Sequence, residues 1–304
     1  MHYIYRKKMT ILNNGTLISL REIGFKFASH MGNKLPKTFL RRVFRNCKNV
    51  ITINDFDDNL SIDLELSEHM QRRIFWMGFY SEDIAYLLKS ILKPGMTVLD
   101  IGANIGEVTL LAGKYVGPTG KVFAFEPIDS IANQLRHNVE ANHFTNVHIE
   151  QYALGDQVDC SKSIYYSCGQ KTSDVHKGLG SIYGQEGDTP LQQTHMLTLD
   201  SWIEKNKIIE SIDLIKIDIE GAEYACLQGA KACIEKFRPQ IIIEIQNYSS
   251  AQAGHKSTDI LDYLSHFNYV FYTINLKGGL TPLDVTKPRE FQNVLCMPNI
   301  NKET

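Results

Sequence analysis

Acidic side chains at the ends of short apolar runs are the residues whose types and spacing could do chemistry. Asp218 and Glu220 close one such run, and Glu244 lies near the end of the next. Alternate residues of a strand face the same side, so Lys216, Asp218 and Glu220 share one face. A charged face inside a buried strand is unfavourable unless its charges are paired or used. We therefore expect Asp218 to accept a proton or orient a hydroxyl group, with Glu220 as second choice and Glu244 in support. For Lys216, an ion pair with a neighbouring acid is at least as good an interpretation as a role in catalysis or substrate orientation.

A glycine turn follows an earlier apolar run that ends in Asp100-Ile101. Its glycines allow a ligand to approach the backbone, and the helix start that follows supplies free N–H groups. A dinucleotide site would require Gly-x-Gly-x-x-Gly, whereas this turn has Gly-x-x-x-Gly. The Asp100 carboxylate would repel a pyrophosphate but suits a ligand with an ammonium and a sulfonium group, such as S-adenosylmethionine. The residues expected to bind this cofactor here are Asp100, Gly102, Ala103, Asn104 and Gly106.

Two further segments complete the expected cofactor site. Glu126, followed by Pro127, ends the second apolar run about twenty residues after the turn, where a ribose diol needs an acceptor. The third run is followed by Leu154 and Asp156, at the edge where an adenine would lie. Asp156 has two equally good interpretations, as an acceptor for the adenine amine or as the first residue of an Asx-turn.

Together these segments resemble the FkbM family of methyltransferases. The resemblance covers residues 80–250, and its most specific part is Lys-Ile-Asp-Ile-Glu-Gly-Ala-Glu. The matching motifs lie at residues 98–106, 125–127, 153–156, 198–202, 216–223 and 239–244. The resemblance implies a seven-stranded Rossmann-like fold, S-adenosylmethionine as methyl donor, and usually O-methylation of a sugar, glycan, lipid-linked or polyketide-type hydroxyl. Family members often have a histidine shortly after the fifth-strand glutamate, where this chain has Gln246.

Several alternatives stay open beside this interpretation. A divalent metal could bridge the hydroxyl and Asp218, with Glu244 and Asn247 as further ligands, but we do not favour it. His255, after the fifth strand, is a further candidate for the base, but a solvated loop histidine is the favoured interpretation. The alternative functions are a ribose 2′-O-methyltransferase acting on RNA and a cofactor-binding module without activity.

Strands and helices that alternate after residue 95 must position these groups. Apolar runs at 97–101, 122–125, 147–149, 214–219 and 241–245 are nearly uncharged, as buried parallel strands require. Helical spacing recurs at 130–141 and 222–235, and segments 269–274 and 293–297 predict an antiparallel pair. The pattern predicts an α/β fold of the Rossmann-like class I methyltransferase type: a mostly parallel seven-stranded sheet, helices on both faces and a C-terminal antiparallel hairpin. The interval 157–197 shows no clear element, so we assign it to substrate recognition.

We expect the first 80 residues to form a basic N-terminal extension. Residues 81–304 should form the methyltransferase domain. The extension combines helical segments, divided at Gly32 and Pro36, with a β-hairpin at 50–64; a helix should follow at 81–92.

Charge is divided unevenly along the 304 residues. The net formal charge is −2, but residues 1–50 hold eleven basic residues and one acid, which leaves −12 for the remainder. Nucleic acid is therefore not expected along the acidic part. The basic segment should pack on the rest of the protein or, as the less favoured alternative, contact a membrane through residues 15–48. Scattered cysteines, the lack of a long apolar run and the lack of a secretory signal predict a cytoplasmic protein, at most peripherally attached to a membrane. The oligomeric state is left open.

Overall fold

The computed structural model describes residues 12–158, 160–166, 180–184, 188–207 and 210–299. The chain divides into two compact units, and the larger begins at Asp83. Residues 1–11 of the predicted extension lie outside the described residues. No helix within the described ranges has both the length and the apolar character needed to cross a bilayer.

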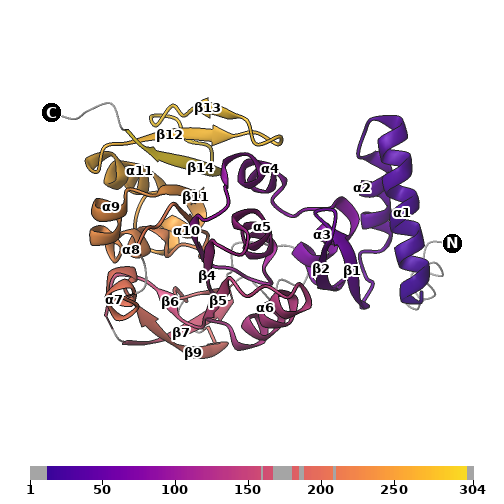
Figure 1. Ribbon diagram of the computed structural model, residues 1–304, viewed down its shortest axis with the longest axis horizontal. Coiled ribbons are helices and arrows are strands. Elements are labelled where there is room, and N and C mark those ends of the chain that lie inside the picture. The colour runs from indigo at the N-terminus through magenta and orange to yellow at the C-terminus, as the bar shows by residue number, and fades with distance from the viewer. Residues whose placement is uncertain (1–11, 159, 167–179, 185–187, 208–209, 300–304) are drawn as a thin grey trace. The chain divides into compact units, whose positions relative to one another are not determined.

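The first unit contains two helices, a hairpin and a third helix (Figure 1). These are α1 (Asn14–Met31), α2 (Leu35–Val43), β1 (Val50–Phe56), β2 (Leu60–Glu65) and α3 (His69–Met77), and β1 pairs antiparallel with β2. The Asn13 side chain caps α1 by accepting from the Thr16 N–H, and Gly32 ends the helix in the left-handed conformation. Pro36 lies in the first turn of α2, where its missing N–H leaves no bond unmade.

The buried face of α1 contains one charged residue, Arg21. Its guanidinium donates to the Phe75 carbonyl at 2.7 Å and pairs with Asp55 at 2.6 Å. In the same unit Phe44 stacks on Trp76 with ring centroids 5.3 Å apart. The predicted hairpin and helical segments are therefore present, and they form a core of their own.

The central sheet of the second unit has the strand order β13-β12-β14-β11-β10-β3-β4-β5. The parallel strands are β3 (Thr97–Ile101), β4 (Lys121–Phe125), β5 (Val147–Glu150), β10 (Leu214–Ile217) and β11 (Gln240–Gln246). β14 (Phe291–Pro298) pairs antiparallel with β11, and β12 (Tyr269–Ile274) with β14. The predicted fold is confirmed, and β13 (Leu280–Pro282) adds a short eighth strand at the edge.

Helices cover both faces of this sheet. α7 (Leu199–Lys205), α8 (Glu223–Gln228), α9 (Lys231–Phe237) and α11 (Ser257–His266) pack on the face that carries Leu99, Ile217 and Ile243. α5 (Glu107–Val116) reaches the opposite face through Thr109, which bonds to Asp100. The remaining helices are α4 (Glu82–Ile91), α6 (Asp129–Ala141) and α10 (Asn247–Gln252).

Two expectations about elements are wrong. The single helix expected at 222–235 is broken into α8 and α9 at Gly229. A Cβ on Gly229 would lie 2.0 Å from the Gly155 carbonyl oxygen, so this close approach requires a glycine.

The second wrong expectation concerns residues 157–197. We expected no regular element there, but the segment contains β-strands. A four-stranded sheet has the order β6-β9-β7-β8, formed by β6 (Ala153–Leu154), β9 (Gln192–Leu197), β7 (Cys160–Tyr166) and β8 (Gly180–Ser181). Most side chains of β7 are at least partly exposed, so its sequence lacks the apolar pattern of a buried strand. Residues 159, 167–179 and 185–187 of this interval lie outside the described residues.

Candidate functional site

The glycine turn after β3 is held between β4 and β10. The N–H groups of Gly102 and Ala103 both donate to the Phe125 carbonyl, at 3.0 and 2.9 Å. Gly102 has φ +80°, and a Cβ on it would lie 1.9 Å from the Asp218 carbonyl oxygen. The turn therefore packs against the end of β10 at a distance that only glycine permits.

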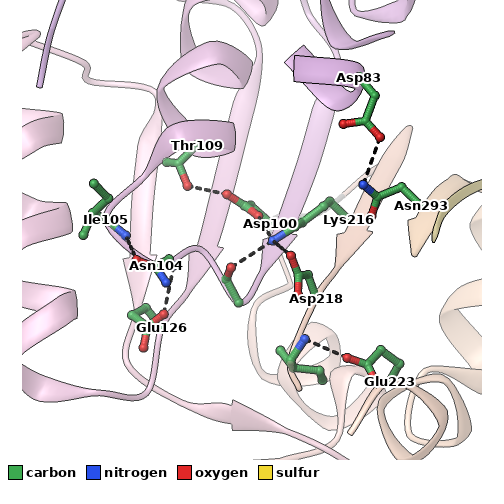
Figure 2. A network of polar contacts seen from close by, with 12 residues as sticks. Asp83, Asp100, Asn104, Ile105, Thr109, Glu126, Lys216, Asp218, Glu223 and Asn293 are labelled. Carbon is green, nitrogen blue, oxygen red and sulfur yellow. Dashed lines mark hydrogen bonds and ion pairs between the residues drawn. The ribbon is translucent and has the colours of Figure 1, made fainter. Parts of the chain in front are cut away.

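Glu126 directly follows β4 and faces the same turn (Figure 2). One carboxylate oxygen accepts from the Asn104 N–H and the other from the Ile128 N–H, both at 2.9 Å. Burial raises the pKa of Glu126 to about 7. Each oxygen accepts one of these two backbone hydrogen bonds and retains acceptor capacity for a further donor.

Asp100 lies beneath the turn and is fully buried. Its Oδ2 accepts from the Thr109 hydroxyl at 2.6 Å, while Oδ1 has no hydrogen-bond partner among the described residues and lies 3.6 Å from Lys216 Nζ. Burial raises the pKa of Asp100. A direct contact between Asp100 and a ligand stays a prediction.

Lys216 on β10 links its own strand to β3, because its ammonium group interacts with residues that belong to or follow each of these strands. Nζ donates to the Gly102 carbonyl at 2.9 Å and lies 3.6 Å from both Asp100 Oδ1 and Asp218 Oδ2. Burial alone would lower the pKa of Lys216, but the charges of Asp218, Asp100 and Glu244 outweigh it and the pKa is raised. The ion-pair interpretation of Lys216 is confirmed.

Asp218 is the accessible member of this charged group. Its side chain is 31% exposed, whereas Asp100 is fully buried and Glu244 is 8% exposed. The Asp218 N–H donates to the Ile101 carbonyl, which anchors its backbone to β3. A carboxylate that is fixed by its strand and open to solvent can meet a substrate hydroxyl.

The turn after Asp218 is held by Glu223, the first residue of α8. The buried Glu223 carboxylate accepts from the N–H groups of Ile219 at 2.9 Å and Gly221 at 3.0 Å, and burial raises its pKa. Between these residues Glu220 adopts φ +52°, and its carbonyl accepts from the Ser181 hydroxyl at 2.8 Å. Glu223 therefore fixes the loop that carries Asp218 and Glu220.

Glu244 lies on the same sheet face, one strand further along. Its Oε2 is buried without a hydrogen-bond partner among the described residues. Burial, followed by the charges of Asp218, Glu220 and Glu223, raises the pKa of Glu244 well above its usual value. Across the sheet it pairs in register with Asn293, whose amide donates to Asp83 at 3.1 Å. Polar groups therefore continue along this face from Asp100 to Asp83 (Figure 2).

The expected adenine side of the site contains Leu154 and Asp156. Leu154 is buried and Asp156 exposed. Burial raises the pKa of the Tyr183 phenol, and the charges of Asp156 and Glu223 raise it further. Pro127 is half-buried, and its carbonyl accepts from the Gln192 side chain at 2.8 Å.

Ser181 and Tyr183 were not predicted as site residues. Both come from the interval 157–197, and the bond from Ser181 to Glu220 brings that interval to the turn after β10. The sequence indicates that this interval is functional only through its length. Length identifies a region but does not identify individual site residues.

The further base candidate His255 and the possible metal ligand Asn247 also lie near this site. His255 Nε2 is 3.4 Å from the Gly221 carbonyl oxygen, and its ring centroid is 5.1 Å from that of Tyr224. The Asn247 side-chain oxygen accepts from the Ser257 hydroxyl. Within the described part of the chain, no three of the His, Cys, Asp and Glu side chains are grouped so that they could hold a metal ion.

The residues at the carboxyl edge fit S-adenosylmethionine. Glu126 has the remaining acceptor capacity that a ribose diol needs, and the buried Asp100 Oδ1 without a hydrogen-bond partner provides negative charge beneath the turn. A ligand in a doubly wound sheet binds beyond the carboxyl ends of its strands, which is where these groups lie. Fold and site together define the Rossmann-like methyltransferase class.

Comparison with known proteins identifies the family. The model described as the methyltransferase FkbM domain matches residues 100–271, more than half of the chain. The chain therefore belongs to the FkbM family of S-adenosylmethionine-dependent methyltransferases.

Three relatives share between 17% and 27% of their aligned residues with this chain. The chain is 26% identical over 239 residues to the AMB antimetabolite synthetase AmbE of Pseudomonas aeruginosa, covering 68% of this chain but 11% of that protein. It is 27% identical over 193 residues to the 31-O-demethyl-FK506 methyltransferase FkbM of Streptomyces tacrolimicus, covering 56% of this chain and 73% of the relative. Among solved structures, an FkbM methyltransferase from Methylobacillus flagellatus has 17% identity and a TM-score of 0.45, over 74% of this chain and 52% of that one.

Proposed function

We propose that this protein transfers a methyl group from S-adenosylmethionine to a hydroxyl group of a sugar, glycan, lipid-linked or polyketide-type small molecule. The observation that carries the proposal is Asp218, an accessible carboxylate beside the glycine turn and paired with the buried Lys216. The name of the Streptomyces relative, a methyltransferase of 31-O-demethyl-FK506, supports an oxygen acceptor.

The cofactor would be held by the turn between Gly102 and Gly106, with its ribose at Glu126 and its adenine near Leu154 and Asp156. When bound, S-adenosylmethionine supplies an electrophilic methyl group on a sulfonium. Asp100 acts from beneath the turn, because its carboxylate is buried.

Asp218 orients the acceptor hydroxyl and takes its proton as the oxygen attacks. Lys216, 3.6 Å from Asp218 Oδ2, restricts where that carboxylate can lie. Glu244 supports it from the next strand, because its raised pKa favours the uncharged form and limits repulsion with Asp218. Glu220 is the second candidate base, on the same turn.

The interval 157–197 would recognise the acceptor. Its supporting observation is the bond from Ser181 to the Glu220 carbonyl, which connects β8 to the turn that follows Asp218. Acceptor specificity should therefore change when this interval changes, while cofactor binding should not.

Asp218→Asn tests the proposal with two separate readouts. Calorimetry should show S-adenosylmethionine binding to the wild type and to Asp218→Asn with affinities within about threefold, because Asp218 is assigned to the acceptor. Methyl transfer should fall at least about a hundredfold, since a positioned base contributes that much. Asp262→Asn, an exposed position on α11, is the matched control and should leave both unchanged.

Because the acceptor is unidentified, transfer is measured as the mass gain of one labelled methyl group in glycan and lipid fractions. Cells that express the wild type are compared with cells that express Asp218→Asn. If the wild type does not bind S-adenosylmethionine, the proposed function is wrong. If Asp218→Asn transfers at the full rate, the role of Asp218 is wrong but the function stands.

A further inference from the structure

Five large apolar side chains are exposed on α1 and α2. Their exposed fractions are 49% for Ile23, 56% for Phe27, 54% for Met31, 69% for Leu35 and 66% for Phe39. Single exposed apolar residues are ordinary, but five on two consecutive helices of one unit are an exposed apolar patch. We call these five residues the apolar face.

The spacing of the five residues makes this face continuous along each helix. Ile23, Phe27 and Met31 recur every four residues on α1, and Leu35 and Phe39 do so on α2, so each set forms one stripe. The face of α1 that packs into the first unit is a different one, which includes Leu17 and Arg21. The apolar face is therefore additional to the surface that stabilises the unit.

Basic side chains border the apolar face. Lys26, His30 and Arg42 each follow an apolar member by three residues, which places them beside it on the helix surface, and all three are exposed. Lys34 lies in the turn between the helices, where it pairs with Glu82. Glu22 is the one acidic residue between positions 12 and 48. Apolar stripes with basic borders are typical of helices that lie in the interface of an anionic membrane.

We propose that the apolar face of α1 and α2 docks on an anionic lipid bilayer. Charge complementarity selects this occupant, because residues 1–50 carry a formal +10 and the remainder −12, so a negative surface attracts this segment and repels the rest. A second copy is disfavoured, since two such faces would bring their basic borders together. The proposal concerns the first unit and does not depend on the methyl-transfer reaction.

Vesicle flotation of the purified full chain tests the proposal. Vesicles of phosphatidylcholine with phosphatidylglycerol should bind the protein at least about tenfold more strongly than vesicles of phosphatidylcholine alone, and high salt should reduce the binding. The variant Phe27→Ser/Phe39→Ser should lose at least about tenfold in binding, because it removes two buried anchors from the bilayer. Phe291→Ser, a phenylalanine of β14 that is 54% exposed, is the matched control and should bind like the wild type.

Two measurements separate the remaining outcomes. Circular dichroism should show the same thermal midpoint for the double variant as for the wild type, because both phenylalanines are exposed. Light scattering should show the same mass for both. The proposal is overturned if anionic vesicles bind no better than neutral ones, if Phe291→Ser loses as much binding, or if the double variant instead separates a dimer into monomers.

Discussion

Lys216 is the residue on which the buried charge of the site depends. Its ammonium group lies within 3.6 Å of Asp100 and Asp218 and donates to the Gly102 carbonyl. It therefore compensates a carboxylate that is fully buried and also attaches the cofactor turn to β10. Removing one member of a buried ion pair is much more destabilising than the pair itself is stabilising, because a charge is left without compensation.

Lys216→Met should therefore destabilise the protein by about 3–5 kcal/mol, measured by urea unfolding. Adding Asp100→Asn should recover part of this loss, since it removes the uncompensated carboxylate. Lys231→Met, an exposed position on α9, is the control and should change stability by less than about 0.5 kcal/mol. A loss below about 1 kcal/mol for Lys216→Met would show that Asp100 does not need this cation.

At the scale of elements, the break between α8 and α9 fixes part of the site. Gly229 lies so close to Gly155 that a Cβ would meet its carbonyl oxygen at 2.0 Å, and Gly155 directly precedes Asp156. The break thus allows α8 and α9 to pack against the segment expected to hold the adenine. A side chain at Gly229 would displace that segment.

Gly229→Ala should lower stability by about 2 kcal/mol, because a backbone atom must move to admit the methyl group. It should also weaken S-adenosylmethionine binding in calorimetry, since Asp156 moves with Gly155. Gly117→Ala is the matched control: φ is +64° and no atom lies within 4 Å of the added Cβ, so it should cost about 1 kcal/mol and leave binding unchanged. If both variants bound S-adenosylmethionine equally well, the segment around Gly155 would not be part of the cofactor site.

The sequence predicts the elements whose side chains are uniformly buried. β3 and β10 are buried at every residue, so their apolar runs are readable without any neighbour. β7 is largely exposed and β6 and β8 have two residues each, so their pairing depends on partners distant in sequence. The break at Gly229 depends on a contact with Gly155, 74 residues earlier, which helical periodicity does not contain.

The same distinction applies to the site. Asp100, Glu126, Asp218 and Glu244 could be grouped because the carboxyl ends of neighbouring parallel strands meet at one edge. The role of Glu223 could not, because its bonds to Ile219 and Gly221 are made in a turn in which Glu220 adopts a positive φ. Non-Gly residues rarely adopt this conformation, so the sequence gives no reason to expect it.

At the scale of the whole molecule, buried carboxyl groups make stability depend on pH. Burial raises the pKa of five acids: Glu68, Asp100, Glu126, Glu223 and Glu244. Above the usual pKa of 4.5 for glutamate, the folded protein retains protons that the unfolded chain releases. Stability therefore falls as the pH rises from that value through the raised pKa values. Lys216 does not oppose this trend, because its raised pKa keeps it charged throughout.

We expect the free energy of unfolding to be lower at about pH 8 than at about pH 5, by several kcal/mol, as measured by urea unfolding. Glu126, whose pKa is raised from 4.5 to about 7, contributes about 2.5 kcal/mol of this difference, since each pKa unit corresponds to about 1.4 kcal/mol and a small part of the shift is already titrated at pH 5. Glu126→Gln should reduce the difference by a similar amount, because glutamine does not ionise. Asp156→Asn, at an exposed acid of the same site, should leave it unchanged. A stability that rises between pH 5 and 8 would mean that the buried carboxyl groups ionise without cost, and the electrostatic account of the site would then be wrong.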